Sequence, residues 1–421
     1  MDDRRLDPDA PLPGPPDPWA ETDMPSPRDG PPWHMTEMIE AEPALAARIF
    51  ERLAADGSAA RLADEVRAHA DAGRPIVVVG CGTSEHGAQA VAALLREGLT
   101  VGGDWTGPGG QPRPISVQAY EASLDLSLGL HQALVIAVSH EGATWATMQA
   151  LESVQHSGGT TALITASRRS PAATETDIVL ETGELDQSWC HTVGYVSPIV
   201  AGIAVEAAIL AAHPTETVDP IDQKDVRSAL EAGLTPEAVA AADVLAGNLA
   251  ACERIIVIGR GVDQVAAREL TLKIEEGTHI PAAMRDVETL LHGHLAGMDA
   301  QTGVIAIGAG DMFTMFEEGS RLVQALRALP PIGVRAGAIL TTDADGDFAD
   351  NVPDDLTPAG RIVVSTRMGS LGPTARALLS TAVPLQLLTE RIARVRGVNP
   401  DPIRRDDRRY LAAAEASSPT S

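Results

Sequence analysis

The sequence predicts an α/β fold made of two doubly wound parallel sheets that are related by internal duplication. Apolar strand-like runs alternate with Ala-rich helical stretches, a pattern typical of a parallel sheet with helices on both faces. The run Val77–Gly82 returns as Ile255–Gly261, so a strand and its Gly-x-Gly turn recur 179 residues apart. A chain of 421 residues can bury one large core or two medium ones. Two similar halves with a ligand site at their interface account for these observations.

Short runs rich in Val, Ile and Leu indicate the strands, because strands covered on both faces read as continuous apolar segments. Ala-rich stretches with helical periodicity indicate the helices. The first half is predicted as helices 42–56 and 59–72, strand 76–80, helix 85–98, strands 115–120 and 133–138, helix 143–156, strand 160–165 and helix 196–212. The second half is predicted as a helical stretch 222–251, a strand from 255, a helix through 269–276, strand 303–307, helix 314–328, strand 361–365 and helix 382–396.

The two ends of the chain look unlike its centre. Residues 1–33 are rich in Pro, Asp and Gly without periodicity, so we expect them to be disordered. The first domain is predicted at 35–215 and the second at 216–410, and the small polar residues 411–421 are expected to form a frayed tail.

The composition argues against nucleic-acid and membrane partners. A net charge of −26 repels nucleic acids and anionic lipids, and 3% aromatic residues cannot supply a stacking platform for bases. No apolar run reaches the length of a membrane span and no signal-peptide core is visible, so we expect a cytoplasmic protein. Three cysteines without metal-binding spacing predict no metal site, and we expect no cofactor.

A charged triplet, Glu269, Lys273 and Glu276, is the most informative motif. Offsets of four and seven residues place these side chains on one stripe of a helix. The triplet is either a solvated face with an i,i+4 ion pair or an acid–base site that moves a proton on a small polyol. His292 follows in Leu-Leu-His-Gly-His, and an imidazole close to two carboxylates suits proton transfer. We favour the acid–base site because of the two turns described next.

The first turn, Gly82, Thr83 and Ser84, follows a predicted strand and opens a helix. Glycine allows the backbone to approach a ligand, and the start of a helix offers free N–H donors. The alternative is a plain structural turn. The dinucleotide fingerprint is incomplete, because Glu85 occupies the place of its third glycine.

The second turn has the same form and contains Ser139, His140, Gly142 and Thr144. Its alternative is an ordinary helix cap made by Ser139. Two such turns at the carboxyl ends of parallel strands are where doubly wound sheets bind ligands, so as a pair they predict a small-molecule site. His191 is a further candidate ligand-binding residue, although a lone histidine is more often structural. A metal pair of His292 and His294 is a weaker alternative.

These residues resemble the SIS (sugar isomerase) domain family over about Met35–Arg409, and within it the isomerase half of the glutamine–fructose-6-phosphate aminotransferases. The resemblance is carried by Cys81–Ser84, by Ser139-x-x-Gly142-x-Thr144, by the charged triplet, by His292-Gly293 and by Val383–Leu388.

The resemblance implies two SIS subdomains and a role for each matching residue. Glu276 would move a proton between C1 and C2 of the open-chain sugar, and His292 would assist ring opening. Lys273 and Glu269 would complete the polar cluster. The two turns would surround the sugar and its phosphate. We also expect a homodimer.

Some positions depart from the family pattern. Glu141 stands where the family has the second serine of a Ser-x-Ser phosphate turn. Arg408 stands where the aminotransferases have a lysine that forms an imine, and a guanidinium cannot do so. No glutaminase half is visible, so we do not expect glutamine-dependent amidotransfer.

The sequence therefore predicts an enzyme acting on a sugar or amino sugar, expected to be phosphorylated, by aldose–ketose isomerisation or by a related deamination or deglycation. The alternatives are a non-catalytic sugar-phosphate-binding protein, such as a sensor or regulator, and a scaffold that keeps only the fold.

Overall fold

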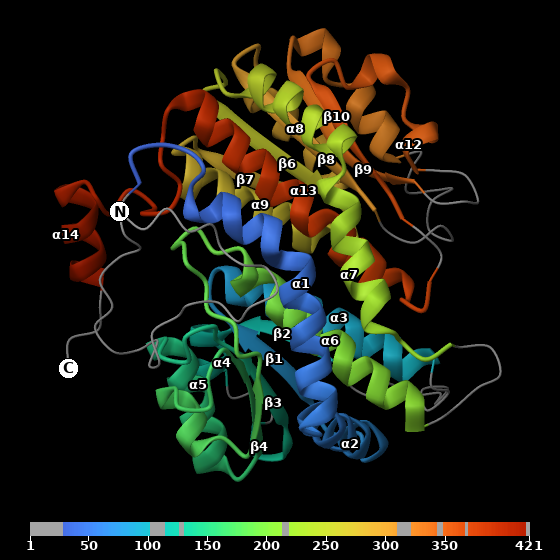
Figure 1. The fold of residues 1–421 in the computed structure, drawn as a ribbon, viewed down its shortest axis with the longest axis vertical. Helices are drawn as coiled ribbons and strands as arrows, with labels where there is room; N and C mark the ends of the chain where they lie inside the picture. Colours follow the sequence, from blue (N-terminus) through green and yellow to red (C-terminus); the bar gives the residue numbers. More distant parts are fainter. Residues whose placement is uncertain are drawn as a thin grey trace.

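The computed structural model describes residues 28–101, 114–125, 130–212, 219–309, 321–342, 348–366 and 369–417. Two five-stranded parallel sheets form the frame, one above the other in Figure 1. The first sheet has the order β2-β1-β3-β4-β5 and the second has the order β10-β9-β8-β6-β7. Read in reverse, the second order is β7-β6-β8-β9-β10, so in both sheets the strands that come first to fifth in the chain are arranged in the order second, first, third, fourth, fifth. The predicted fold of two similar doubly wound sheets is therefore confirmed.

The strands of the first sheet are β1 (Ile76–Gly80), β2 (Ile115–Gln118), β3 (Leu134–Val138), β4 (Thr160–Thr165) and β5 (Ile178–Glu181). Those of the second are β6 (Arg254–Gly259), β7 (Ala282–Asp286), β8 (Thr302–Gly308), β9 (Arg335–Thr342) and β10 (Gly360–Ser365). The central pairs β1–β3 and β6–β8 place Val78 opposite Ile136 and Ile256 opposite Val304. Every residue of β1, β3 and β8 is buried, which explains their continuous apolar sequences.

Three strands were not predicted. The missed strands β5 and β7 are short or polar, and β9 is diluted by Ala and Gly. Because these strands have little apolar signal of their own, only pairing with a neighbour defines them.

The helices are α1 (His34–Ala55), α2 (Ser58–Asp71), α3 (Thr83–Val101), α4 (Ala119–Leu124), α5 (Trp145–Ser157), α6 (Val193–Ala212), α7 (Gln223–Glu231), α8 (Pro236–Leu249), α9 (Asp263–Thr278), α10 (Val287–Leu291), α12 (Phe348–Asn351), α13 (Pro373–Arg396) and α14 (Arg408–Ser417). The predicted helical stretch 222–251 is two helices, because Thr235 caps α8 and Pro236 begins it. Of the predicted helix 314–328, residues 321–327 are helical and 314–320 lie outside the described residues.

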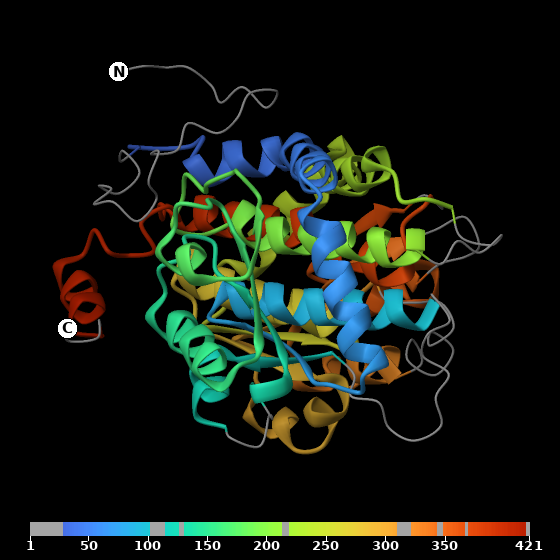
Figure 2. The same ribbon diagram turned by 90° about the horizontal axis from the view of Figure 1, so that it is seen from below.

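Helices from both halves meet between the sheets, where α3 packs on α6 and α9, and α13 packs on α8 and α9 (Figures 1 and 2). Each half thereby presents the first helix after its Gly-x-Gly turn to the other half. This contact brings the start of α3 and the length of α9 together.

The prediction that no apolar run is long enough to span a membrane is wrong for helix α6. Within the described part of the chain it is the one helix that passes this test by length and composition, with a mean hydropathy of 1.8. However, 83% of that window is buried inside the protein, among α1, α2 and α3. Its apolar surface therefore serves the core of the first half.

The ordered chain begins earlier than predicted. Residues 1–27 lie outside the described residues, but Trp33, placed in the disordered segment by the sequence, is only 6% exposed. Arg28 forms an ion pair with Glu37 at 2.9 Å. The carboxylate of Asp401 accepts the backbone N–H groups of His34 and Met35, both at 2.9 Å. Residues 28–33 therefore dock onto the start of α1. The domain limits stay a prediction.

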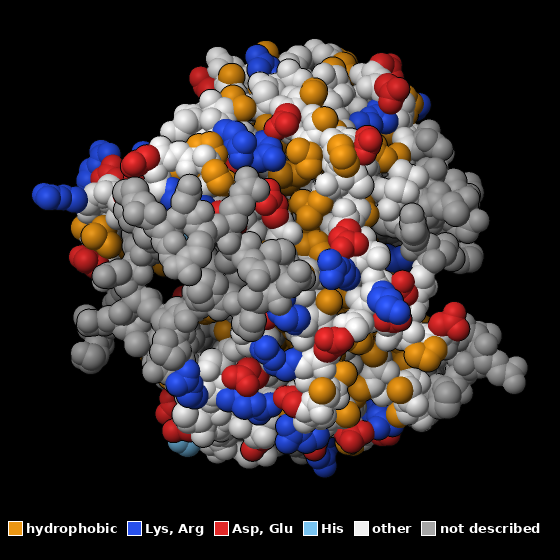
Figure 3. Space-filling view, in the orientation of Figure 1, with side chains coloured by type: hydrophobic (Ala, Val, Ile, Leu, Met, Phe, Trp, Pro, Cys, Tyr) orange, Lys and Arg blue, Asp and Glu red, His pale blue; other side chains and the backbone are white. Residues whose placement is uncertain are grey.

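At the other end of the chain, α14 stands off the body of the molecule in both ribbon views (Figures 1 and 2) and buries none of its residues. On the face shown in Figure 3, acidic and basic side chains are mixed rather than gathered by sign.

Candidate functional site

The charged triplet lies on α9 and is buried, so the solvated-face interpretation is wrong. Nζ of Lys273 lies 2.5 Å from Oε2 of Glu276 and 3.6 Å from Oε1 of Glu269. The side chains of Lys273 and Glu269 are fully buried, whereas that of Glu276 is 22% exposed. Glu276 is therefore the partly exposed member of the triplet.

Residues from the first half complete the triplet. The Thr83 hydroxyl donates to Oε1 of Glu269 at 3.4 Å, and Nδ1 of His86 lies 2.6 Å from Oε2 of the same carboxylate. Both residues belong to the first turn of α3, directly after the Gly82 turn. The triplet is thus in contact with residues of the other half, across the interface of the two halves.

Electrostatics separate the roles within the triplet. Burial disfavours the ammonium of Lys273, but the carboxylates of Glu276 and Glu269 outweigh burial and raise its pKa. Burial also raises the pKa of Glu276, while Lys273 beside it limits the rise. Lys273 is consequently a fixed positive charge, and Glu276 is a carboxyl group whose pKa moves towards neutrality. A pKa closer to the working pH suits a group that both accepts and returns a proton.

The first predicted turn lies beside the triplet. Gly82 has a left-handed φ of 57° that allows the chain to leave β1 and enter α3 directly. Thr83 is buried against Glu269 as described, and Ser84 is half-buried with its backbone N–H donated to the carbonyl of Cys81 at 3.1 Å.

In the second turn, the residue that caps the following helix differs from the predicted one. Thr144, not Ser139, is the N-cap residue of α5, so the interpretation of Ser139 as a plain helix cap is wrong. Ser139 is buried and its hydroxyl donates to Oγ1 of Thr144 at 3.5 Å. Gly142 has a φ of 65° between them, and Thr144 is exposed.

A buried polar network extends from the second turn to Asp186 and His191. Nε2 of His140 accepts the backbone N–H of Asp186 at 3.0 Å, and the His140 ring lies 5.3 Å from that of His191. Burial lowers the pKa of His140 to about 4. Burial holds the pKa of His191 well below its usual value, and the neighbouring His140, Lys273 and Arg405 lower it further. Both imidazoles are therefore neutral at physiological pH.

Asp186 belongs to the same network and accepts two backbone N–H groups. Its carboxylate accepts the N–H groups of Thr192 at 2.9 Å and Gly194 at 2.7 Å. Burial nevertheless raises the pKa of Asp186 to about 7, and the charge of Lys273 acts against this rise.

Two predicted residues are not brought to this cluster. The side chain of His292 is 76% exposed and pairs with Glu288 at 3.2 Å. Among the described residues, no hydrogen bond or ion pair joins His292 to the triplet. Arg408 is exposed on α14, which stands off the body, so the chain alone does not carry it to Glu276. Within the described ranges, no group of His, Cys, Asp and Glu side chains could hold a metal ion.

His86 and Asp186 were not identified from the sequence as candidate site residues. His86 shares a helical turn with Thr83, so its position after the Gly-x-Gly turn was the available signal. Asp186 lies outside any regular element, and only its folded contacts reveal it.

Comparisons with known proteins agree with this fold. The SIS domain family model matches residues 248–327, a span that contains α9 and its triplet. Glutamine–fructose-6-phosphate aminotransferases are similar in sequence: that of Caulobacter vibrioides is 29% identical over 279 residues, covering 64% of this chain and 42% of the relative. That of Treponema pallidum is 29% identical over 338 residues, covering 77% and 49%. The chain thus spans less than half the length of these curated relatives, and the resemblance found in the sequence is confirmed.

Solved structures show the same fold. The C-terminal domain of glucosamine-fructose-6-phosphate aminotransferase from Francisella tularensis matches with a TM-score of 0.71 at 20% identity, covering 89% of this chain and 99% of that domain. Tagatose-6-phosphate ketose/aldose isomerase from Escherichia coli matches with a TM-score of 0.66 at 18% identity, covering 90% and 98%. Glucosamine-6-phosphate deaminase from Thermotoga maritima matches with a TM-score of 0.61 at 17% identity, covering 88% and 97%.

Proposed function

Because the chain carries a SIS domain and folds as two SIS subdomains, we propose that it is an enzyme acting on a phosphorylated sugar or amino sugar, by aldose–ketose isomerisation or by a related deamination or deglycation. The observation that carries this proposal is the pair of Lys273 and Glu276, joined at 2.5 Å, with Glu276 as the accessible member.

The arrangement suits a proton shuttle between two adjacent carbons. The Glu276 carboxylate removes the proton from C2 of an open-chain aldose, and the electron pair moves to form the enediol as the carbonyl oxygen takes up a proton. Glu276 then returns its proton to C1 while the C2 hydroxyl gives up its own, which yields the ketose. Lys273 keeps Glu276 ionised at the start of the cycle, and Glu269 holds Lys273 in place.

Lys273 is not suited to imine chemistry. A nucleophilic amine must be unprotonated, but the two carboxylates raise the pKa of Lys273 and burial confines it. An enediol route requires no lysine nucleophile, which agrees with an arginine at position 408.

The two turns are the proposed sugar and phosphate subsites. Thr144 offers an exposed hydroxyl beside the buried Ser139, and Gly82, Thr83 and Ser84 lie next to the triplet. Relatives whose names specify fructose 6-phosphate, tagatose 6-phosphate or glucosamine 6-phosphate support a phosphorylated substrate. Glu141 is exposed, so its side chain can point away from a phosphate held at this turn.

A cytoplasmic location and a homodimer are part of this proposal. Both fit a metabolic enzyme of this kind, and size-exclusion chromatography with light scattering tests the dimer.

Proton exchange with solvent provides the direct test. The protein is incubated in D₂O with fructose 6-phosphate, tagatose 6-phosphate or glucosamine 6-phosphate, and with the unphosphorylated sugars, and NMR follows deuterium at C1 and C2. We expect exchange with at least one phosphorylated sugar and none with Glu276→Gln. Saturable binding without exchange for every sugar would instead favour the non-catalytic sugar-phosphate-binding protein.

A further inference from the structure

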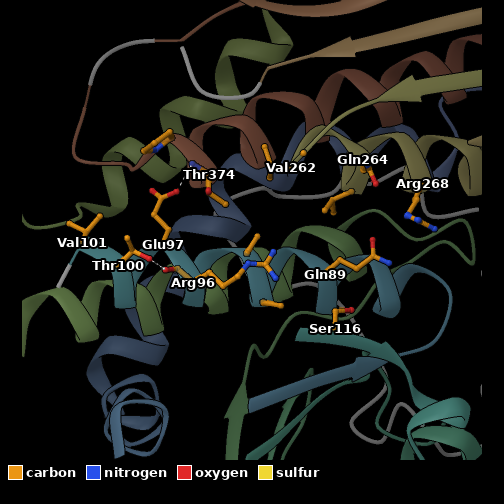
Figure 4. Close-up of a pocket in the computed structure, with 15 residues that line it drawn as sticks. Gln89, Arg96, Glu97, Thr100, Val101, Ser116, Val262, Gln264, Arg268 and Thr374 are labelled. Carbon is orange, nitrogen blue, oxygen red and sulfur yellow. Dashed lines mark hydrogen bonds between the residues drawn. The ribbon is translucent and has the colours of Figure 1, made fainter. Parts of the chain in front are cut away.

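A large cavity lies between the two halves, away from the triplet. It has a volume of about 850 Å³ and is bounded by α3 on one side and by the starts of α9 and α13 on the other (Figure 4). Ligand pockets in proteins typically measure about 300–1,000 Å³. None of the proposed catalytic or sugar-binding residues lines this cavity.

Two arginines face this cavity from opposite sides. Arg96 belongs to α3 and Arg268 belongs to α9 (Figure 4). Arg96 lines the cavity, gives one N–H to the carbonyl oxygen of Pro114 at 2.9 Å and makes a further interaction within the protein. Arg268 is exposed and has no hydrogen bond or ion pair among the described residues. In a chain with a net charge of −26, an unpaired arginine that faces a cavity indicates an anionic ligand.

The turn that opens α9 borders the same cavity and repeats the turn of the first half. Gly82 and Gly261 have φ angles of 57° and 56°. A Cβ atom on Gly80 would lie 2.3 Å from the backbone oxygen of Ser84, and one on Gly259 would lie 2.8 Å from that of Asp263. In each turn the first glycine is therefore required by the close approach of the backbone, and the second by its left-handed φ. The first copy lies beside the triplet, whereas the second opens onto this cavity.

We propose that this cavity is a second ligand site, one that binds a phosphomonoester through Arg96 and Arg268. Gln89, Gln264 and Ser116 lie around the arginines and supply hydrogen bonds to the rest of the ligand. Glu97 lies at the opposite end, where its carboxylate accepts the N–H of Thr374 at 3.0 Å. Its charge directs the phosphate towards the Arg268 end.

The position of Arg268 couples the cavity to the triplet through helix α9. Arg268 directly precedes Glu269 on α9, so a ligand that fixes Arg268 also fixes the helix that carries the triplet. Arg268 borders a smaller cavity with Gly82 and His86 as well, whereas Arg96 lines only the larger one of the two. Loss of binding in both arginine variants therefore identifies the larger cavity.

Equilibrium dialysis of the full chain against inorganic phosphate and fructose 6-phosphate tests the site. The variants are Arg268→Gln and Arg96→Gln, and the control is Arg327→Gln, an exposed arginine that lines neither cavity. We expect both cavity variants to weaken one class of sites by ~10-fold or more, since a hydrogen bond to a charged group is worth roughly 1.5–3 kcal/mol. The control should bind like the wild type.

A variant with a weakened first site separates this inference from the proposed function. Thr83→Ala with Ser139→Ala should leave phosphate binding at the arginines intact, whatever happens to turnover. If Arg96→Gln proves misfolded by circular dichroism, the exposed Arg268→Gln and the charge reversal Arg268→Glu carry the test. Unchanged phosphate binding in both Arg268 variants would overturn the second site, as would the absence of saturable phosphate binding in the variant that combines Thr83→Ala with Ser139→Ala.

Discussion

Nδ1 of His86 lies 2.6 Å from Oε2 of Glu269, and this contact joins two residues that are 183 positions apart. His86 belongs to the first half and Glu269 to the second, so the contact holds the triplet against the turn of the opposite sheet. The triplet is therefore neither a surface feature nor the property of one half.

Glu276→Gln should retain the fold and sugar-phosphate binding but lose turnover by roughly 10²–10⁴-fold, the usual contribution of a general acid–base. The amide keeps the shape and can still accept from Lys273 but cannot take a proton. Glu275→Gln is the matched control, because Glu275 is the exposed neighbour on α9. Steady-state kinetics with the sugar phosphate that shows deuterium exchange provides the measurement. Near-normal turnover of Glu276→Gln would rule out its role as the proton shuttle.

The hydroxyls of the two turns should contribute to ligand affinity. Thr83→Ala and Ser139→Ala should each weaken binding by about 1 kcal/mol, or somewhat more where the partner is charged. Isothermal titration with the same sugar phosphate measures the loss, and Ser153→Ala on the outer part of α5 serves as a control. Full affinity in the double variant would place the sugar elsewhere.

Borohydride reduction in the presence of substrate should trap no sugar on Lys273. The carboxylates of Glu276 and Glu269 raise the pKa of this lysine, so the free amine needed for an imine is scarce. Peptide mass spectrometry after reduction checks this expectation, with Lys224, the other lysine of the chain, as an internal reference. A sugar adduct on Lys273 would contradict the enediol route and favour imine chemistry.

His140 should make stability depend on pH. Burial lowers its pKa to about 4, against about 6.5 in an unfolded chain. Between these values the unfolded chain binds a proton that the folded protein does not, so the free energy of unfolding falls as the pH drops from about 6.5 to 4. The stability is fully present above this window, and the full loss corresponds to about 3 kcal/mol.

Urea denaturation of the wild type and His140→Gln between pH 7 and pH 4 isolates this effect. Glutamine can still accept the N–H of Asp186 but does not titrate. The wild type should therefore lose stability relative to the variant as the pH falls. The raised pKa of Asp186, about 7, acts in the opposite direction in the same window, but it is present in both proteins and cancels in the difference. Parallel pH profiles would contradict the burial of a neutral His140.

Truncation should distinguish the docked residues from those before them. A chain starting at Arg28 should unfold at the same denaturant concentration as the full chain. A chain starting at Met35 should lose about 3 kcal/mol, the usual cost of removing a buried aromatic side chain, because Trp33 is buried and His34 donates to Asp401. Equal stability of the two truncated chains would show that Trp33 contributes nothing.

The sequence by itself determined the two-sheet frame and the residues of the triplet. Continuous apolar runs such as Ile76–Gly80 identify buried strands locally, and the spacing from Glu269 to Glu276 follows from helix geometry alone. The recurrence of the Gly-x-Gly turn predicted two similar halves, since it requires only that like sequences fold alike.

Only the tertiary structure decided what surrounds these residues. Burial of Lys273 depends on α3 and α13 packing over α9, and His86 meets Glu269 through a contact that no local pattern encodes. The same packing leaves His292 and Arg408 outside the cluster, although the family resemblance had matched both to positions of the site. Spacing along a chain fixes neighbours within one helix, but the distance between elements is set by how their apolar faces pack, and this depends on the whole chain.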